Sequence, residues 1–295
     1  MTDGPTGSTV PRRQLGRHLR DLRTKSRFTV RAAARKLEWS EAKMWRIETG
    51  QVSLRSHDVQ TMCTVYGAPP DLTEVLMALA KETKARGWWH AYGDVIPEGF
   101  HLYVGLSEAA VSVSLYQSEL VPGQLQTEDY ARAIIRGHLR DISEENLEGR
   151  VRLRMERQAI LTRTTDPLKF RVVLNETVLR RPIGGPEVMA RQLAHLVYMS
   201  ELPNIEICVV PFANGMHLGA ASGGFNLLRF PLNADGSESE PATVYVEGFT
   251  GSLYLDKPKE VDEYDAAFRD IWETALDGSA SRHLIAEVAG EYEQG

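Results

Sequence analysis

Cysteine is scarce in this sequence. Only Cys63 and Cys208 occur among 295 residues, far apart and without a nearby partner of the kind that binds a metal. Two isolated thiols exclude the disulfide framework of a small secreted domain and the ligand spacing of a structural zinc site. We therefore expect reduced thiols and a cytoplasmic protein.

Long apolar runs and catalytic motifs are lacking as well. No apolar run reaches the roughly 18 to 20 residues of a membrane-spanning helix. The first ten residues, MTDGPTGSTV, have neither the basic start nor the apolar core of a signal peptide. The eight histidines are scattered, and none belongs to an HExxH motif, a Cys/His cluster or a nucleophile elbow. The sequence thus predicts no membrane segment, no metal site, no cofactor and no catalytic residue, and so a protein that is not an enzyme.

Charge is unevenly distributed along the chain. The composition, 42% apolar and 25% charged, is that of a globular protein, and the length favours two domains. The net charge of −6 conceals 13 Lys and Arg against six Asp and Glu in residues 1–60. That segment carries about +7 and the remainder about −13. A basic head on an acidic body predicts that only the head meets nucleic acid.

The stretch WSEAKMWRIETG, from Trp39 to Gly50, has the marks of one short capped helix. Ser40 can accept backbone N–H bonds at a helix start, and Gly50 can take the left-handed conformation that ends one. Met44 and Ile47 are three residues apart and can face a core. The remaining face is polar and cationic, which suits a DNA groove, and it carries Glu41, Ala42, Lys43 and Arg46.

Four further helices are predicted around this stretch. Leucines recur at spacings of three and four in the first, and Thr29 can cap the second. Five short helices, with a tight turn between the second and third, match a helix-turn-helix domain whose third helix enters the major groove. The predicted ranges are 12–26, 29–37, 39–50, 56–66 and 71–86.

Residues 12–80 resemble the helix-turn-helix domain of the Cro/C1-type repressors, the xenobiotic-response-element family. The resemblance implies a structural ion pair between Arg23 and Glu48. The sequence departs from the family at Val30, where many relatives have a glutamine that helps to hold the backbone and bases, so less readout is expected from the second helix. The residues that the resemblance places at double-stranded DNA are Ser40, Glu41, Ala42, Lys43 and Arg46, with Gln51, Ser53 and Arg55 near phosphates.

A cationic helix face has an alternative explanation, because Lys and Arg also occur on solvated surfaces. The caps, the spacing and the pairing of Arg23 with Glu48 together favour DNA binding over that explanation. The role of Trp45 is open. Its ring can cover the domain's own surface or pack against the sugar-phosphate backbone.

An aromatic-rich segment, KARGWWHAYGDVIPEGFHLYVG, follows the head. Its apolar residues have no regular helix or strand spacing, which predicts a junction between domains. Aromatic rings are costly to leave in water, so we expect the junction to be packed. Trp88 and Trp89 can belong to an interdomain core or to a ligand cage. The expected domains are a disordered lead at 1–11, the helix-turn-helix domain at 12–83, the junction at 84–105 and a C-terminal regulatory domain at 106–295.

The C-terminal domain combines helices and strands without a regular alternation, which favours an α+β fold. The whole chain is therefore expected to be mainly α with an α+β second domain. Helices are predicted at 107–119, 127–135, 144–164, 187–201, 259–276 and 279–292. Strands are predicted at 170–174, 205–210, 225–230, 243–247 and 252–255.

Four segments in succession resemble the C-terminal domain of WhiJ-like actinomycete regulators, which are described as antitoxin-like. They are GWWHAYGDVIPEGFHLYVGLSEAA, ELVPGQLQTEDYARAII, LRRPIGGPEVMARQLAHL and IEICVVPFANGMHLGAASGGFNLLRF. The resemblance covers nearly all of residues 86–290. It implies a developmental or stress-related transcription factor, frequently partnered by a small protein encoded nearby.

Two features of the body could bind a ligand or partner. The loop Gly215 to Gly224 can present backbone N–H groups to an anion beside His217, or it can simply connect two strands, with catalysis as a further alternative. The Arg-rich stretch 148–163 can bind DNA or an acidic partner, although such alternating charges more often mark a solvated or salt-bridged helix face. The candidate ligand- or partner-binding residues are Trp88, Trp89, His217, Gly223 and Gly224.

The leading hypothesis is a sequence-specific transcriptional regulator, a repressor, that acts as a homodimer. Its body would sense a small neighbour-encoded protein or a ligand. The rival is an antitoxin-like protein that acts by binding that small protein, with DNA binding only autoregulatory. An enzyme controlled by its own DNA-binding head is a third possibility, but the sequence shows no compact group of catalytic residues in the body.

Overall fold

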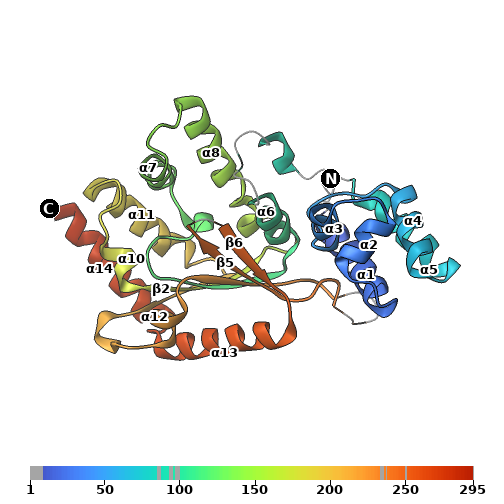
Figure 1. Cartoon of the computed structure of the whole chain (residues 1–295). Coiled ribbons are helices and arrows are strands. Elements are labelled where there is room, and N and C mark those ends of the chain that lie inside the picture. The colour runs from blue at the N-terminus through green and yellow to red at the C-terminus, as the bar shows by residue number, and fades with distance from the viewer. Residues whose placement is uncertain are drawn as a thin grey trace. The chain divides into compact units, whose positions relative to one another are not determined.

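The computed structural model describes residues 9–84, 88–92, 96, 100–232, 236, 238–249 and 251–294 (Figure 1). The chain divides into two compact units. The first contains the described residues up to 92 together with Phe100–Ala109, and the second contains residue 96 and the residues from Ala110 onward. We call these units the head and the body. A helical head followed by an α+β body confirms the predicted fold class.

The five helices predicted for the head form around one apolar core. Leu15 and Leu19 on the first helix, and Met44 and Ile47 on the third, are each at most 2% exposed. These are the positions that the three- and four-residue spacing assigned to the inside. The helices are α1 (Thr9–Lys25), α2 (Val30–Lys36), α3 (Glu41–Glu48), α4 (Ser56–Tyr66) and α5 (Pro70–Glu82).

Helix α1 begins before the predicted range. The sequence reading assigned residues 1–11 to a disordered lead, and this was wrong for Thr9 to Pro11, which are helical. Thr9 is only 6% exposed because it packs so closely against Gly105 that a Cβ there would lie 1.9 Å from its Oγ1. Residues 1–8 lie outside the described residues.

The segment predicted as a junction contributes two elements to the head, the 3-10 helix η1 (Trp88–Tyr92) and α6 (Phe100–Ala109). Helix α6 packs on α1, and the Trp89 ring is 1% exposed and lies against Gly105. The domain limits at 83 and 105 stay predictions. The division into compact units assigns α6 to the head, although the predicted boundary cuts through it.

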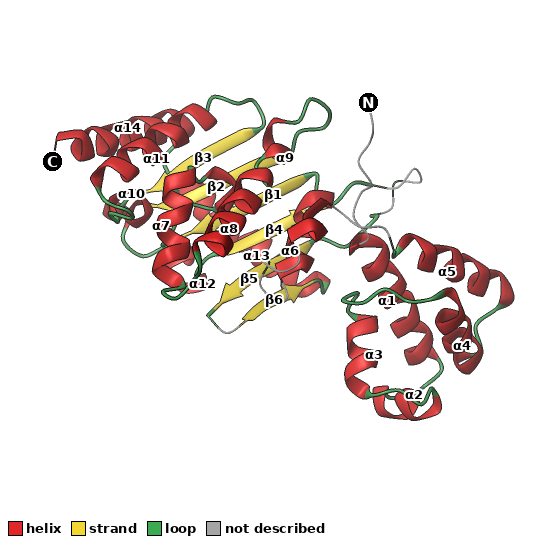
Figure 2. Ribbon diagram, turned by 90° about the horizontal axis from the view of Figure 1, so that it is seen from above, coloured by secondary structure: helices red, strands yellow, loops and turns green. Residues whose placement is uncertain are grey.

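The body is built on one six-stranded mixed sheet (Figure 2). Its order is β3-β2-β1-β4-β5-β6, in which β1, β2 and β3 are parallel and the remaining neighbours are antiparallel. The five predicted strands are all present. The strands are β1 (Ser112–Gln117), β2 (Lys169–Asn175), β3 (Ile205–Val210), β4 (Phe225–Arg229), β5 (Thr243–Gly248) and β6 (Gly251–Leu255).

Helices cover both faces of the sheet. Helix α13 (Pro258–Thr274) lies on one face, where its Phe268 and Ile271 pack with Val173 and Val244 of the strands. Helices α7 (Glu128–His138), α8 (Glu144–Glu156) and α11 (Pro186–Met199) lie on the other (Figures 1 and 2). The remaining elements are η2 (Gly123–Leu125), α9 (Ala159–Thr162), α10 (Glu176–Arg180), η3 (Phe212–Asn214), α12 (Leu218–Ser222) and α14 (Gly278–Gln294).

Two predicted helices of the body were wrong in type or extent. The helix expected at 107–119 is replaced by the end of α6 and by β1, which lies inside the sheet. The buried residues Val113 and Leu115 alternate with serines, a two-residue period typical of a strand. The helix expected at 144–164 is divided into α8 and α9 after Glu156.

The close contact between α1 and α3 in the head yields a prediction. A Cβ at Gly16 of α1 would lie 2.5 Å from the carbonyl oxygen of Ile47 in α3. Gly16→Ala should therefore destabilise the head, although alanine favours a helix by about 1 kcal/mol over glycine. We expect a lower melting temperature for this variant, measured by circular dichroism.

Gly290→Ala is the matched control, because Gly290 lies within α14 and a Cβ there would meet nothing within 4 Å. This variant should gain up to about 1 kcal/mol from helix propensity. Equal melting temperatures for the two variants would show that α1 and α3 can move apart at no cost.

Candidate DNA-binding surface

Helix α3 is defined at both ends by the caps that its sequence predicts. The Ser40 hydroxyl oxygen accepts a hydrogen bond of 3.1 Å from the backbone N–H of Lys43. After Thr49, Gly50 takes the left-handed conformation with φ of 73°, and the Gln51 N–H donates back to the Arg46 carbonyl at 2.8 Å. The helix is consequently short and has fixed ends.

The two sides of α3 have opposite environments. Met44 and Ile47 are buried at 0% and 2% exposure and hold the helix against α1 and α2. The predicted DNA-facing residues of the same helix turn outward, except for Lys43, which is half-buried. The exposed residues of the predicted DNA-binding set are Ser40, Glu41, Ala42, Arg46, Gln51, Ser53 and Arg55.

Lys43 is half-buried because it packs on an aromatic ring of its own domain. Its ammonium nitrogen lies 3.5 Å from the centroid of the Trp39 ring, within the range of a cation–π contact. Trp39 belongs to the turn between α2 and α3, where Glu38 has a φ of 56°. A left-handed backbone at a residue other than glycine is strained, so the turn is set by the packing of the two helices.

Arg23 and Glu48 form the ion pair that the resemblance implied. Arg23 Nε lies 2.6 Å from Glu48 Oε1, its second terminal nitrogen donates to Oε2 at 2.9 Å, and its first donates to the Phe28 carbonyl at 2.8 Å. The side chains are 12% and 7% exposed. The hydrogen bond to Glu48 raises the pKa of Arg23. This fork joins α1, the segment before α2, and the end of α3.

Two residues that sequence reasoning left open can be placed. Trp45 is 57% exposed on α3, so its ring covers little of the domain's own surface. Val30 is the first residue of α2 and packs half-buried against the core of the head. Helix α2 also carries three exposed cations, Arg31, Arg35 and Lys36.

The close approaches at two glycines are features that the sequence reading missed. Gly16 lets α1 touch the backbone of α3, and Gly50 lies so near Arg13 that a Cβ would be 2.8 Å from its Cα. Arg13 itself is 5% exposed. An isolated glycine in the leucine- and arginine-rich stretch of α1 was the available signal, because glycine weakens a helix unless close packing requires it.

The candidate ligand-binding residues lie in separate units. Trp88 and Trp89 belong to the head, where their rings meet edge to face with centroids 6.1 Å apart. In the body, His217 is 7% exposed and its ring lies across Tyr116, 5.8 Å between centroids. Gly223 has a φ of 68°.

The loop around His217 packs closely on the end of β1. A Cβ at Gly219 would lie 2.5 Å from the Tyr116 ring, and one at Gly224 would lie 2.9 Å from Gln117 Oε1. Glycine is therefore needed here for packing, which supports the reading of a connecting loop. A ligand- or partner-binding role for His217, Gly223 and Gly224 stays a prediction.

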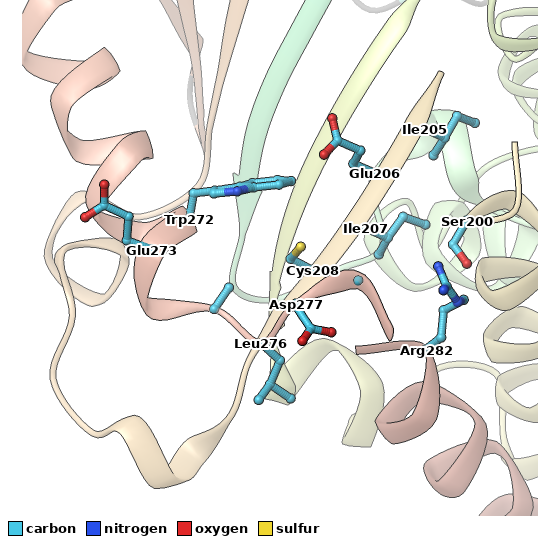
Figure 3. A pocket seen from close by; sticks show the side chains of 12 residues that line it. Ser200, Ile205, Glu206, Ile207, Cys208, Trp272, Glu273, Leu276, Asp277 and Arg282 are labelled. Atoms are coloured by element: carbon cyan, nitrogen blue, oxygen red, sulfur yellow. The ribbon is translucent and has the colours of Figure 1, made fainter. Parts of the chain in front are cut away.

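The body also has a pocket of about 590 Å³ beside the edge strand β3 (Figure 3). Its charged lining comprises the carboxylates of Glu206, Glu273 and Asp277 and the guanidinium of Arg282. Burial raises the pKa of the Cys208 thiol in this pocket to about 11. The thiol is protonated at neutral pH and is a poor nucleophile.

The capped α3 beside α2 in a five-helix bundle defines a helix-turn-helix DNA-binding domain (Figure 2). Sequence comparison agrees, because residues 14–76 match the helix-turn-helix domain family. Residues 100–287 match the family described as a domain of unknown function (DUF5753). The chain belongs to this DUF5753 family and carries a helix-turn-helix domain of DNA-binding regulators ahead of it.

The two other comparisons gave no relatives: neither a curated protein nor a solved structure matches the chain. Helix α6 falls within the DUF5753 match, yet it packs on α1 of the head. None of the helices in the described ranges is long and apolar enough to cross a membrane.

The ion pair of the head gives a prediction for stability. Glu48→Met should lower the free energy of unfolding by about 3 kcal/mol, because it leaves the Arg23 guanidinium largely buried without its carboxylate. The double variant Arg23→Met/Glu48→Met should lose less than Glu48→Met alone. Urea unfolding of the four proteins of this cycle measures the coupling.

An exposed pair in the body is the control. Arg136 and Glu144 are 2.7 Å apart and 55% and 77% exposed, so the same substitutions there should show a coupling of at most about 1 kcal/mol. Additive losses at Arg23 and Glu48 would remove the pair as a constraint on the head.

Proposed function

We propose that this protein is a sequence-specific transcriptional repressor whose helix α3 reads base edges in the major groove. The observation that carries the proposal is the division of α3, whose apolar residues are anchored in the core while its polar residues face solvent. Arg46 suits the paired acceptors of guanine, and Glu41 suits the amino group of cytosine. Ser40, Ala42 and Lys43 complete the surface presented to DNA.

The loop after α3 would supply the contacts that orient the head. Gln51, Ser53 and Arg55 are exposed between α3 and α4, and in this proposal they bind phosphates. Such contacts give affinity without sequence information and make binding dependent on salt. Trp45, which is also exposed, packs against the sugar-phosphate backbone in this arrangement.

Replacing Arg46 tests base readout. Arg46→Ala should weaken binding to an operator selected from a random DNA library by about 1 to 3 kcal/mol, because one bidentate base contact is lost. The loss of binding free energy caused by Arg46→Ala should be smaller on a scrambled duplex of equal length. Fluorescence anisotropy at fixed salt concentration measures both affinities.

Lys81→Ala is the matched control, since Lys81 is an exposed cation on α5, which packs on α1 and α4. It removes the same charge from the head and should leave the preference for the operator unchanged. An equal loss for Arg46→Ala on every sequence would make Arg46 a phosphate contact and contradict base readout.

For the body we propose a regulatory role as a cytoplasmic homodimer. Two heads on one side of a dimer would read half-sites about one helical turn apart, roughly 34 Å. The four segments that resemble the WhiJ-like regulators support an actinomycete origin and a role in development or stress. They also support a small protein encoded nearby as a partner. The proposed domain limits remain 12–83, 84–105 and 106–295.

Partner binding can be separated from DNA binding with the same variant. The intact chain should co-purify with the small neighbour-encoded protein, and Arg46→Ala should retain that protein while binding the operator more weakly. If operator occupancy in cells does not respond to the neighbouring gene, the body does not regulate the head through this partner. Full biological activity of Arg46→Ala would favour the rival, in which the chain acts as an antitoxin-like protein.

A further inference from the structure

The arginines of α8 point in two directions. On the side of α7, the acidic residues of α8 are paired: Glu148 Oε1 lies 2.7 Å from Arg132 Nε, and Glu144 Oε1 lies 2.7 Å from Arg136. Arg152 is exposed. This part of the helix is the salt-bridged, solvated surface that its alternating charges predict.

The other side of α8 differs from that prediction. Arg150, Arg154 and Arg157 follow one another at spacings of four and three, so they share one face of the helix and its C-terminal end. Arg157 is 8% exposed, and the Arg150 Nε is buried. Helix α8 lies on the side of the sheet opposite α13 (Figure 1). Arg150 and Arg154 are half-buried, whereas Arg152 is exposed.

The guanidinium groups of Arg150 and Arg154 have few polar partners among the described residues. Arg154 donates one hydrogen bond, of 2.7 Å, to the neutral oxygen of Gln126. The buried Nε of Arg150 has no hydrogen-bond partner among the described residues. Neither Arg150 nor Arg154 forms an ion pair within that part of the chain, and removing even part of a cation from water without a counter-charge is costly.

The electrostatics agree with this geometry. Burial, followed by the charge of Arg157, lowers the pKa of Arg154 to about 10, and burial lowers the pKa of Arg150. The charge of Glu247 in β5 raises the pKa of Arg154, although the two side chains form no ion pair among the described residues. An anion bound between these cations would reverse the effect of their mutual repulsion.

The segment opposite Arg154 is held in place by glutamines. Gln158 donates to the carbonyl oxygens of Gly123 and Gln126 at 3.2 and 2.7 Å, and Gln126 donates to that of Val121 at 2.6 Å. A Cβ at Gly123 would lie 4.0 Å from Arg154 Nε. The Arg154 side chain therefore runs along a backbone segment whose position is fixed.

We propose that Arg150 and Arg154, on the inward face of α8, form a binding site for a small anion that carries a carboxylate or phosphate group. Planar guanidinium forks match both groups through paired, charge-assisted hydrogen bonds. A small molecule is the expected ligand, because half-buried side chains are less accessible to the backbone of DNA or to an extended acidic protein surface. This site does not depend on DNA recognition by the head.

The test is binding of defined anions to the full-length protein. Inorganic phosphate and pyrophosphate probe the phosphate class, and succinate and citrate probe the carboxylate class, each against chloride at equal ionic strength. An anion of the right class should raise the melting temperature by mass action, and isothermal titration should give its affinity. The two sets of probes distinguish the chemical source of the anion.

Three variants that each remove one positive charge identify the site. Arg154→Gln and Arg150→Gln should weaken the affinity by about tenfold to a hundredfold, since each removes charge-assisted hydrogen bonds. Arg152→Gln, on the exposed side of the same helix, should bind as the parent protein does. Should Arg154→Gln fail to fold, Arg150→Gln answers the same question.

Two results would overturn the proposal. One is the absence of stabilisation by every probe anion relative to chloride. The other is equal weakening in Arg150→Gln and Arg152→Gln, which would indicate only a general effect of net charge.

Discussion

The fork between Arg23 and Glu48 is the constraint on which the DNA-binding surface depends. It connects the end of α1, the carbonyl of Phe28 before α2, and the end of α3 in a single, largely buried unit. Beside it, the absence of a side chain at Gly16 lets the backbones of α1 and α3 touch. Because the pair is out of water, separating its partners is costly, and α3 therefore keeps one orientation with respect to the other helices.

That fixed orientation explains how a helix as short as Glu41–Glu48 can present a defined surface. An isolated helix of this length would not be stable in water. The cap at Ser40 gives a backbone N–H at the helix start a hydrogen-bond partner, and Gly50 ends the helix in the left-handed conformation. Burial of Met44 and Ile47 supplies the stability that the intrinsic helix propensity of so short a segment cannot. The solvent-facing side chains of Glu41, Ala42 and Arg46 are not part of this core and are available for recognition. Lys43 is half-buried, and its ammonium lies over the Trp39 ring.

In the body, the feature that stands out is the placement of charged residues on the two sides of α8. The mixed sheet of the body is covered by helices on both faces. Helix α8 combines a salt-bridged outer side with an inner side on which Arg150 and Arg154 form no ion pair among the described residues. A scaffold could bury apolar residues at those positions more cheaply. Half-buried charge that is retained without a counter-charge is accordingly a reason to look for a ligand of the body.

The sequence by itself determined the elements with strong local signals. Spacing and caps located the helices of the head, and apolar runs located the later strands, because these signals act within a few residues. The prediction from sequence was wrong at 107–119, where a helical stretch and an alternating strand adjoin. It was also wrong at the start of α1, where Thr9 packs against Gly105, a residue far along the chain. The direction of each α8 arginine was likewise decided only by tertiary structure. Alternating charges on a helix look the same in sequence whether charged side chains of a neighbouring helix pair with them or not.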